Sequence, residues 1–229
     1  MSSAHPAIAL VHTLPLQIAE QLSTAIIDEQ YQPKERLKET ELSAHFGVSR
    51  STIREALRIL EMRKLVRILP QRGAVVTSLT RREVEDLFEI RAFLVGLIAR
   101  RVAGEWNDEN ASQLDGLLAQ LQAARDDAPA YAKASAAAAI DLAKLSRNDH
   151  LVDLLTSFAH QIGRYTRLGL LGEARRKRSL QLWRKLFDAI KAGDQTESES
   201  FNRQLALENR DAALRVLDAR NRPSAQTVV

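Results

Sequence analysis

The 229-residue sequence contains no cysteine, which excludes disulfide bonds, thiolate metal sites and a cysteine nucleophile. Neither a glycine-rich phosphate loop nor the Ser-His-Asp order of a hydrolase stands out. Apolar runs such as Ala136 to Ile140 are too short to span a bilayer. The N-terminus also lacks the charged and apolar regions of a secretory signal. These absences argue against an enzyme and against a membrane partner, and they lead us to expect a cytoplasmic protein.

The composition, which is 45% hydrophobic, suits one or two globular domains with a substantial core. The net charge of +4 indicates an anionic partner only weakly, but the distribution of charge is more informative. Between residues 50 and 72 only Glu55 and Glu61 are acidic. The basic residues of this segment are Arg50, Arg54, Arg58, Arg63, Lys64, Arg67 and Arg72. Such a concentration is typical of a surface that binds a phosphate backbone.

Residues 47–61 have the pattern of a helix-turn-helix. Gly47 can adopt a positive φ and so allows a sharp turn, and Ser49 suits the N-cap of the following helix. Apolar residues then recur at the spacing of one buried helical stripe: Ile53, Ala56, Leu57 and Leu60. This pattern predicts that the second helix packs one face on a core and presents the other to solvent.

The opposite face of this helix carries a basic ridge of Arg50, Arg54 and Arg58, spaced four residues apart. Ser51 and Thr52 lie in the first turn, where recognition helices contact base edges and phosphates. We interpret the segment as a DNA-reading helix. The alternative is an ordinary surface helix with a solvated, charged face.

The flanking residues extend this pattern to a winged helix. Helices are predicted over 14–30, over 39–46 and from residue 50 to about 64. Two β-prone runs, 65–69 and 74–77, are joined by the turn formers of residues 70–73 and predict a hairpin. Arg72 at its tip suits a minor-groove or phosphate contact, although a plain hairpin turn is the alternative.

The N-terminal pattern resembles the winged-helix domain of GntR-type bacterial transcription regulators over residues 12–79. The residues that carry the resemblance are Leu37, Glu41-Leu42-Ser43, Gly47-Val48-Ser49-Arg50, Arg54-Glu55-Ala56-Leu57, Leu60-Glu61, Arg72-Gly73 and Val76. The resemblance implies that DNA is contacted by Ser49, Arg50, Ser51, Thr52 and Arg54, with Arg72 and Gly73 at the wing. Relatives often have an arginine where this chain has Thr40, which implies a lost or weaker contact and a different operator preference.

The rest of the chain is predicted to be helical. Thr80 suits the cap of a long helix, and breaks near residues 104–107, 126–129, 147–148, 171–172 and 193–194 give about six helices without a further strand. The predicted fold class is mostly α, a winged helix-turn-helix of three helices plus a β-hairpin followed by an all-α bundle. The expected domains are a flexible arm (1–12), a DNA-binding domain (13–79), an effector-binding and dimerisation domain (80–222) and a disordered tail (223–229).

The second half resembles the FCD effector domain of the FadR-like branch, through residues 87–94 and the helix endings Ser146-Arg147-Asn148 and 189–194. Many such domains hold a metal with one Asp and three His. The corresponding positions here are Ser135, Ala139, Trp183 and Leu205, so we expect neither a metal nor another cofactor. An Arg can instead clamp a carboxylate of an effector. The candidate pocket residues are Arg91, Ser135, Ala139, Arg164, Arg167 and Trp183. The run Arg175-Arg176-Lys177-Arg178 reads as an exposed helix start.

The sequence therefore predicts a homodimeric, sequence-specific regulator of transcription that reads an inverted repeat in double-stranded DNA. We expect a ligand-responsive repressor of a metabolic operon that senses a small organic acid or a related metabolite. In a first alternative, the helical domain only dimerises and binds no effector. In a second, the helical half is an enzyme with an appended DNA anchor.

Overall fold

The computed structural model describes residues 13–70 and 72–221. The predicted arm (1–12) and tail (223–229) lie outside these residues. The chain divides into two compact units, an N-terminal unit that ends at Ser78 and a helical unit that begins at Leu79. Within the described residues, no helix is long and apolar enough to cross a membrane.

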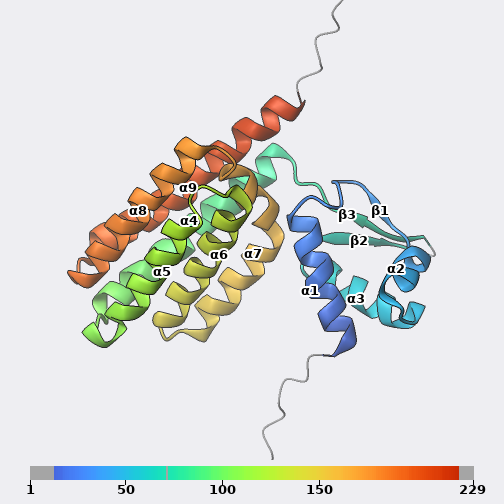
Figure 1. Cartoon of the computed structure of the whole chain (residues 1–229), viewed down its shortest axis with the longest axis horizontal. Coiled ribbons are helices and arrows are strands. Elements are labelled where there is room, and N and C mark those ends of the chain that lie inside the picture. Colours follow the sequence, from blue (N-terminus) through green and yellow to red (C-terminus); the bar gives the residue numbers. More distant parts are fainter. Residues whose placement is uncertain (1–12, 71, 222–229) are drawn as a thin grey trace, which may run out of the picture. The chain divides into compact units, whose positions relative to one another are not determined.

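The N-terminal unit contains three helices and a small sheet (Figure 1). The helices are α1 (Leu14–Ile27), α2 (Glu39–Phe46) and α3 (Arg50–Met62), and the strands are β1 (Arg36–Leu37), β2 (Val66–Leu69) and β3 (Gly73–Val76). The sheet is antiparallel in the order β1-β3-β2. This architecture confirms the predicted winged helix-turn-helix. Strand β1 was not predicted, because two residues are too few to show a period-two pattern.

The turn between α2 and α3 forms as its residues predict. Gly47 ends α2 with a φ of 64°, and the Ser49 hydroxyl accepts a hydrogen bond from the backbone N–H of Thr52 at 3.2 Å. The stripe of Ile53, Ala56, Leu57 and Leu60 is buried against α1 and the sheet. Helix α1 ends three residues earlier than predicted, since Glu29 adopts a φ of 62°.

The helical unit is a bundle of six α-helices within the described residues: α4 (Arg81–Gly104), α5 (Ala111–Ala123), α6 (Ala128–Leu145), α7 (Asp149–Gly169), α8 (Glu173–Lys191) and α9 (Gln195–Asn221). A 3-10 turn over Asp108–Asn110 precedes α5. The helices are separated at the five predicted breaks. Thr80 begins α4 with a capping box to Glu83, as expected for a helix start.

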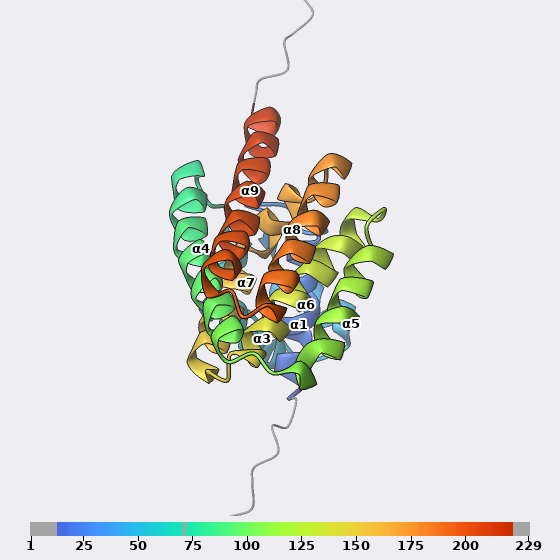
Figure 2. The ribbon, with the colours of Figure 1, turned by 90° about the vertical axis from the view of Figure 1, so that its left-hand side faces the viewer.

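The helices of this unit enclose a large apolar core and a second, smaller apolar cluster. Helices α4 and α9 lie side by side along much of their length, and α8 packs on α9 from the other side (Figure 2). Leu142, Leu186 and Ile190 are among the core residues with 1% exposure or less. At the N-terminal end of α4, the backbone N–H of Leu79 donates a 2.7 Å hydrogen bond to the hydroxyl of Tyr165 on α7. This contact ties the first residue of the unit to the bundle.

Candidate functional site

The first turn of α3 presents a cluster of hydroxyl groups. The Ser49 hydroxyl lies 2.7 Å from that of Ser51 and 2.8 Å from that of Thr52. Ser49, Arg50 and Ser51 are exposed, and Thr52 is half-buried. The N–H groups that begin a helix lack intrahelical partners and carry the positive end of its dipole. This turn can therefore accept a phosphate group, with hydroxyls small enough to allow close approach.

Arg54, one turn further along α3, is held by Glu39 at the start of α2. Its Nε donates to Oε1 of Glu39 at 2.9 Å, and its Nη2 donates to Oε2 at 2.7 Å. This hydrogen bond is the main reason why the pKa of the Glu39 carboxyl falls below its ordinary value. The two-pronged contact fixes the plane of the guanidinium and leaves Nη1 for an outside acceptor. Sequence reasoning gave Glu39 no role, because its partner lies fifteen residues away.

The other residues that were predicted to contact DNA lie on α2 and on the wing, the hairpin of β2 and β3. Thr40 is exposed as the second residue of α2, and Arg72 is exposed at the turn between β2 and β3. Arg36 of β1 donates from Nε to the backbone oxygen of Arg72 at 2.8 Å, so the third strand supports the wing. Arg36 was missed by sequence reasoning because β1 was not predicted.

Gly73 is buried, whereas its neighbour Arg72 at the wing is exposed. Its φ is 83°, and a Cβ at this position would collide with the backbone carbonyl oxygen of Leu37 on β1. The residue therefore permits the close pairing of β3 with β1 and offers no side chain to DNA. Its contribution to the surface is the shape of the wing.

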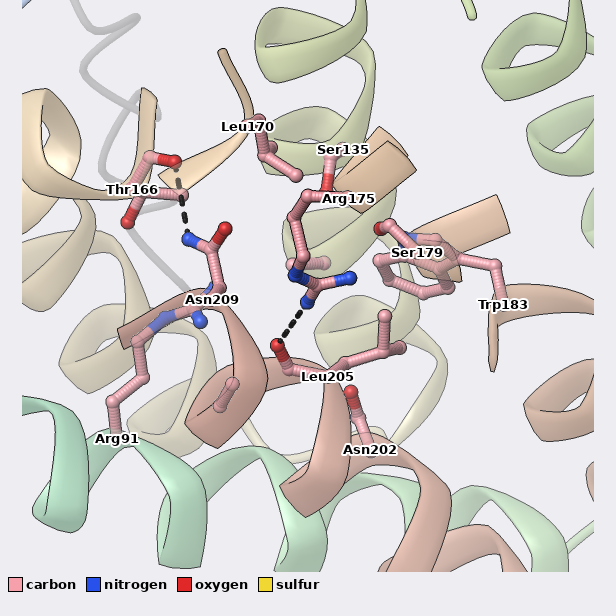
Figure 3. A pocket seen from close by; sticks show the side chains of 12 residues that line it. Arg91, Ser135, Thr166, Leu170, Arg175, Ser179, Trp183, Asn202, Leu205 and Asn209 are labelled. Carbon is pink, nitrogen blue, oxygen red and sulfur yellow. Dashed lines mark hydrogen bonds between the residues drawn. The ribbon is translucent and has the colours of Figure 1, made fainter. Parts of the chain in front are cut away.

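The helical unit contains a small cavity of about 20 Å³ between its helices (Figure 3). The lining residues are Arg91, Ser135, Ala139, Thr166, Leu170, Arg175, Ser179, Trp183, Asn202, Leu205, Ala206 and Asn209. Four of the six residues predicted from the sequence are among them: Arg91, Ser135, Ala139 and Trp183. Arg164 and Arg167 do not line the cavity. The Nη2 of Arg164 instead donates to the hydroxyl of Tyr165 at 2.6 Å.

Arg175 is the most prominent charged group of the cavity, and Figure 3 shows its guanidinium among the lining side chains. Its side chain is 10% exposed, and its Nη2 donates to the backbone oxygen of Leu205 at 3.0 Å. Its Nε and Nη1 have no hydrogen-bond partner among the described residues. Glu208 is its nearest carboxylate, 3.8 Å from Nη1. Burial lowers the pKa of Arg175, so the cation is incompletely compensated.

The run that contains Arg175 was expected to be an exposed helix start. It does lie at the start of α8 and Lys177 is exposed, but the predicted exposure is wrong for Arg175 and Arg176. Arg175 lines the cavity, and Arg176 is 6% exposed. The Arg176 guanidinium donates to the backbone oxygens of Arg125 at 2.8 Å and Leu171 at 2.5 Å. Those carbonyls lie at the ends of α5 and α7, where helices leave acceptors unpaired. A local sequence pattern does not show that these helix ends converge on α8.

Arg91, Trp183 and Asn209 also contribute polar groups to the lining. Burial lowers the pKa of Arg91 to about 10, so this side chain remains protonated near neutral pH. The indole nitrogen of Trp183 and the side-chain oxygen of Asn209 have no hydrogen-bond partner among the described residues. No acidic residue lines the cavity. Two cations, unused donors on Arg175 and a lining without a carboxylate are suited to an anionic ligand.

The four positions that correspond to metal ligands in similar domains all lie on this lining: Ser135, Ala139, Trp183 and Leu205. Their side chains offer a hydroxyl, a methyl, an indole and an isobutyl group, and none of these is a good ligand for a divalent metal. Within the described residues, no three His, Asp or Glu side chains are grouped so that they could hold a metal ion. The residues present therefore do not fit the metal, and Arg175 supplies positive charge in the same cavity.

Comparisons with known proteins agree with both halves of the molecule. Residues 14–76 match the family described as bacterial regulatory proteins of the gntR family, and residues 86–208 match the FCD domain. An uncharacterised HTH-type transcriptional regulator of Bacillus subtilis, YdhC, is 32% identical over 180 residues, which cover 77% of this chain and 80% of that protein. The gluconate operon transcriptional repressor of Bacillus licheniformis is 34% identical over 47% of this chain and 44% of its own length.

Two solved structures share the fold. Escherichia coli McbR/YncC superposes with a TM-score of 0.77 at 18% identity, covering 91% of this chain and 99% of that one. A putative GntR regulator from Rhodococcus superposes with a TM-score of 0.71 at 22% identity, covering 90% and 98%. At this level of identity the likeness concerns the fold alone.

Proposed function

The chain belongs to the GntR family of bacterial transcription regulators and carries an FCD domain, and we propose that it is a homodimeric repressor of a metabolic operon that responds to a small organic acid. The family consists of DNA-binding regulators and not of enzymes. The observation that carries the proposal is the cavity of the helical unit, where the guanidinium groups of Arg91 and Arg175 face no carboxylate in the lining.

For operator binding, we assign base and phosphate contacts to the exposed start of α3 and to the wing. Arg50 and Arg54 would enter the major groove, with Ser49, Ser51 and Thr52 at the adjacent phosphates. Thr40 on α2 and Arg72 on the wing would contact the backbone on either side. Glu39 would keep the Arg54 guanidinium in one orientation, which favours readout of one base over general attraction to phosphate.

For effector binding, we propose that Arg175 receives the carboxylate of an organic acid without a metal. Its Nε and Nη1 lie on opposite edges of the guanidinium, and either can donate to a carboxylate oxygen, while Trp183 can add an indole N–H. Arg91 on α4 would interact with a second polar group of the ligand. Because the cavity of about 20 Å³ is smaller than such a ligand, binding must move helices or side chains apart. That movement would couple ligand binding to operator binding, with a coupling free energy of ~1–3 kcal/mol.

The cavity volume also supports a second candidate function. A space of about 20 Å³ holds roughly one water molecule, so the helical unit can be a closed dimerisation domain without an effector. The polar lining would then stabilise the packing of α7, α8 and α9. This candidate predicts operator binding that no small molecule alters.

A titration followed by fluorescence anisotropy separates the two candidates. The full chain is titrated onto the DNA upstream of its own gene, with and without a panel of small mono- and dicarboxylates. Thermal unfolding is measured with the same panel, since a ligand that binds only the folded state raises the midpoint. Operator binding that one carboxylate weakens supports the proposal. Selective binding that is insensitive to the panel, without a thermal shift, supports the dimerisation domain instead.

A further inference from the structure

The C-terminal end of α7 contacts two places that matter for regulation. Thr166 and Leu170 line the cavity of the helical unit. Tyr165, the neighbour of Thr166, accepts the hydrogen bond from the backbone N–H of Leu79. Leu79 is the first residue of the helical unit and directly follows Ser78, the last residue of the N-terminal unit. The same end of α7 therefore contacts both the candidate ligand site and the residue that leads to the DNA-binding unit.

One wall of the cavity is a close contact between α7 and α9. A Cβ at Gly169 would collide with the backbone oxygen and with the side-chain oxygen of Asn209. The Nδ2 of Asn209 donates at 3.0 Å to the backbone oxygen of Thr166, as Figure 3 shows, and this carbonyl is among the last four of α7. Asn209 is 4% exposed and itself lines the cavity. The wall therefore has no room for an added methyl group, and a ligand that enlarges the cavity can do so by opening this contact.

The hydroxyl of Tyr165 connects the end of α7 to the linker. It accepts the N–H of Leu79 at 2.7 Å and the Nη2 of Arg164 at 2.6 Å. The Tyr165 and Arg164 side chains are both buried, and a bond from a charged donor holds the hydroxyl firmly in one position. Leu79 precedes the N-cap of α4, so that helix offers its N–H no acceptor. The position of the linker therefore depends on the position of α7.

The smaller apolar cluster of the unit joins the same elements. Its buried members come from the start of α4, the end of α7 and the C-terminal part of α9: Val84, Phe88, Ile162, Tyr165, Leu168, Ala213 and Leu214. Phe88 and Ile162 are fully buried. Close-packed side chains transmit a displacement to their neighbours because little free space absorbs it. A shift of α7 relative to α9 is therefore expected to reach the start of α4.

We propose that ligand entry opens the contact between Gly169 and Asn209, and that Tyr165 converts this opening into the release of Leu79. The inference rests on the proposed function and describes how the cavity controls operator binding. When α7 moves away from α9, the Tyr165 hydroxyl withdraws from the Leu79 N–H and the start of α4 gains freedom. A dimer then loses more entropy when it places both N-terminal units on an inverted repeat, and operator affinity falls. Tyr165 is a positioning residue in this relay.

A route through α4 alone makes a different prediction. Arg91 lies on α4 and lines the cavity, so a ligand could pull on that helix directly. In that case, opening the contact at Gly169 would leave the hydrogen bond of Leu79 intact. The state of the Leu79 amide therefore distinguishes the two routes.

Hydrogen exchange of the Leu79 amide in the full chain, without ligand or DNA, tests the relay. Gly169→Ala forces the contact open, and Tyr165→Phe removes the acceptor but keeps the ring. Each should speed exchange at Leu79 about 2- to 10-fold, as expected for the loss of one hydrogen bond. Asn209→Ala weakens the same contact without a clash and should act in the same direction, which covers the case that Gly169→Ala does not fold. A wild-type rate at Leu79 in the variants of this contact overturns the proposal.

Two control variants make the same chemical changes elsewhere. Gly116→Ala on α5 adds a methyl group that meets no atom within 4 Å. Tyr131→Phe on α6 removes the hydroxyl of a fully buried tyrosine that belongs to the large core and not to the smaller cluster. Both should leave exchange at Leu79 at the wild-type rate, with the amides of α5 and α6 as an internal reference. Equally fast exchange at Leu79 in the controls would indicate general loosening and overturn the relay.

Operator binding tests whether the two steps act in series. Anisotropy titrations use the DNA upstream of the protein's own gene and one half-site of that operator. Gly169→Ala and Tyr165→Phe should each weaken full-operator binding about 5-fold or more, with half-site affinity unchanged. The double variant should stay within about twofold of the weaker single variant, because both changes break the same connection. Losses that multiply overturn the relay. Absence of selective DNA binding by the wild type would count against the proposed function, while the exchange rates at Leu79 would still decide the relay.

Discussion

Glu39 of α2 binds the guanidinium of Arg54 on α3 through two hydrogen bonds of 2.9 and 2.7 Å. The pair joins the two helices of the helix-turn-helix on the face that we expect to meet DNA. Arg54 is therefore an oriented donor and not a freely moving charge. An oriented guanidinium matches a base edge or a phosphate with less loss of side-chain entropy on binding.

The first prediction concerns the arginines of α3. Replacing Arg50 or Arg54 with alanine should cost about 1–3 kcal/mol for each lost base contact, or roughly a 5- to 150-fold loss of operator affinity. Anisotropy titrations on operator and scrambled DNA measure this loss. Arg184→Ala, an exposed arginine on α8, is the control and should leave affinity unchanged. Full operator affinity in both α3 variants would exclude this docking.

Glu39→Gln tests the orientation of Arg54 separately from its charge. We expect this variant to lose discrimination between operator and scrambled DNA while its affinity for scrambled DNA is kept or increased, since one acidic group is removed. Glu41→Gln on the same helix is the matched control, because Glu41 binds Lys38 at 2.6 Å and not an arginine of α3. Equal discrimination in the two variants would mean that Glu39 does not orient Arg54 for readout.

The same ion pair predicts a pH dependence of stability. The Arg54 hydrogen bond lowers the pKa of Glu39 below its ordinary value of 4.5. The pair therefore contributes its full stability above pH 4.5, and this contribution is lost as the pH falls through the lowered pKa of the folded protein. The difference in free energy of unfolding between wild type and Glu39→Gln should be constant from pH 7 to about 5 and shrink below that. Urea titrations at several pH values measure it, and a difference that grows on acidification contradicts the assignment.

Two glycines with positive φ should respond differently to alanine. In Gly47→Ala the added methyl group meets no atom within 4 Å. The variant should lose only the free energy needed to hold alanine in a left-handed backbone conformation, about 1–2 kcal/mol. Gly73→Ala has the same backbone cost and also places a methyl group against the Leu37 carbonyl oxygen. The decrease in the free energy of unfolding should therefore be clearly larger for Gly73→Ala than for Gly47→Ala. Denaturant unfolding of both variants compares the two. Equal losses would show that β1 can move away from β3 at no cost.

Arg175→Met tests the effector site. The substitution keeps much of the side-chain volume while it removes the charge and the donors at Nε and Nη1. We expect operator affinity to be retained and the response to carboxylates to be abolished, both in anisotropy and in thermal shift. Arg184→Met on the same helix is the control. A carboxylate response that survives in Arg175→Met would place the effector elsewhere.

The sequence by itself determined the features that depend on neighbours along the chain. A glycine at the turn, a serine at a helix start and an apolar stripe at helical spacing act within one or two turns of backbone. For that reason Gly47, the Ser49 cap and the five breaks between the helices of the second unit could all be predicted. The position of the lining residues Ser135 and Trp183 followed from resemblance to a family, since counting from a matched helix end fixes a helix face.

Only the tertiary structure decided which distant groups meet. Strand β1 exists because Arg36 and Leu37 pair with β3, some forty residues away, and not because of any local propensity. Arg164 was expected in the pocket but contacts Tyr165, whereas Arg175 lies in the cavity and donates to Leu205. Both arginines look alike in sequence. They differ in the direction of their side chains in the packed bundle. That direction depends on how each helix is rotated about its axis and on which partners lie close to it in the folded chain.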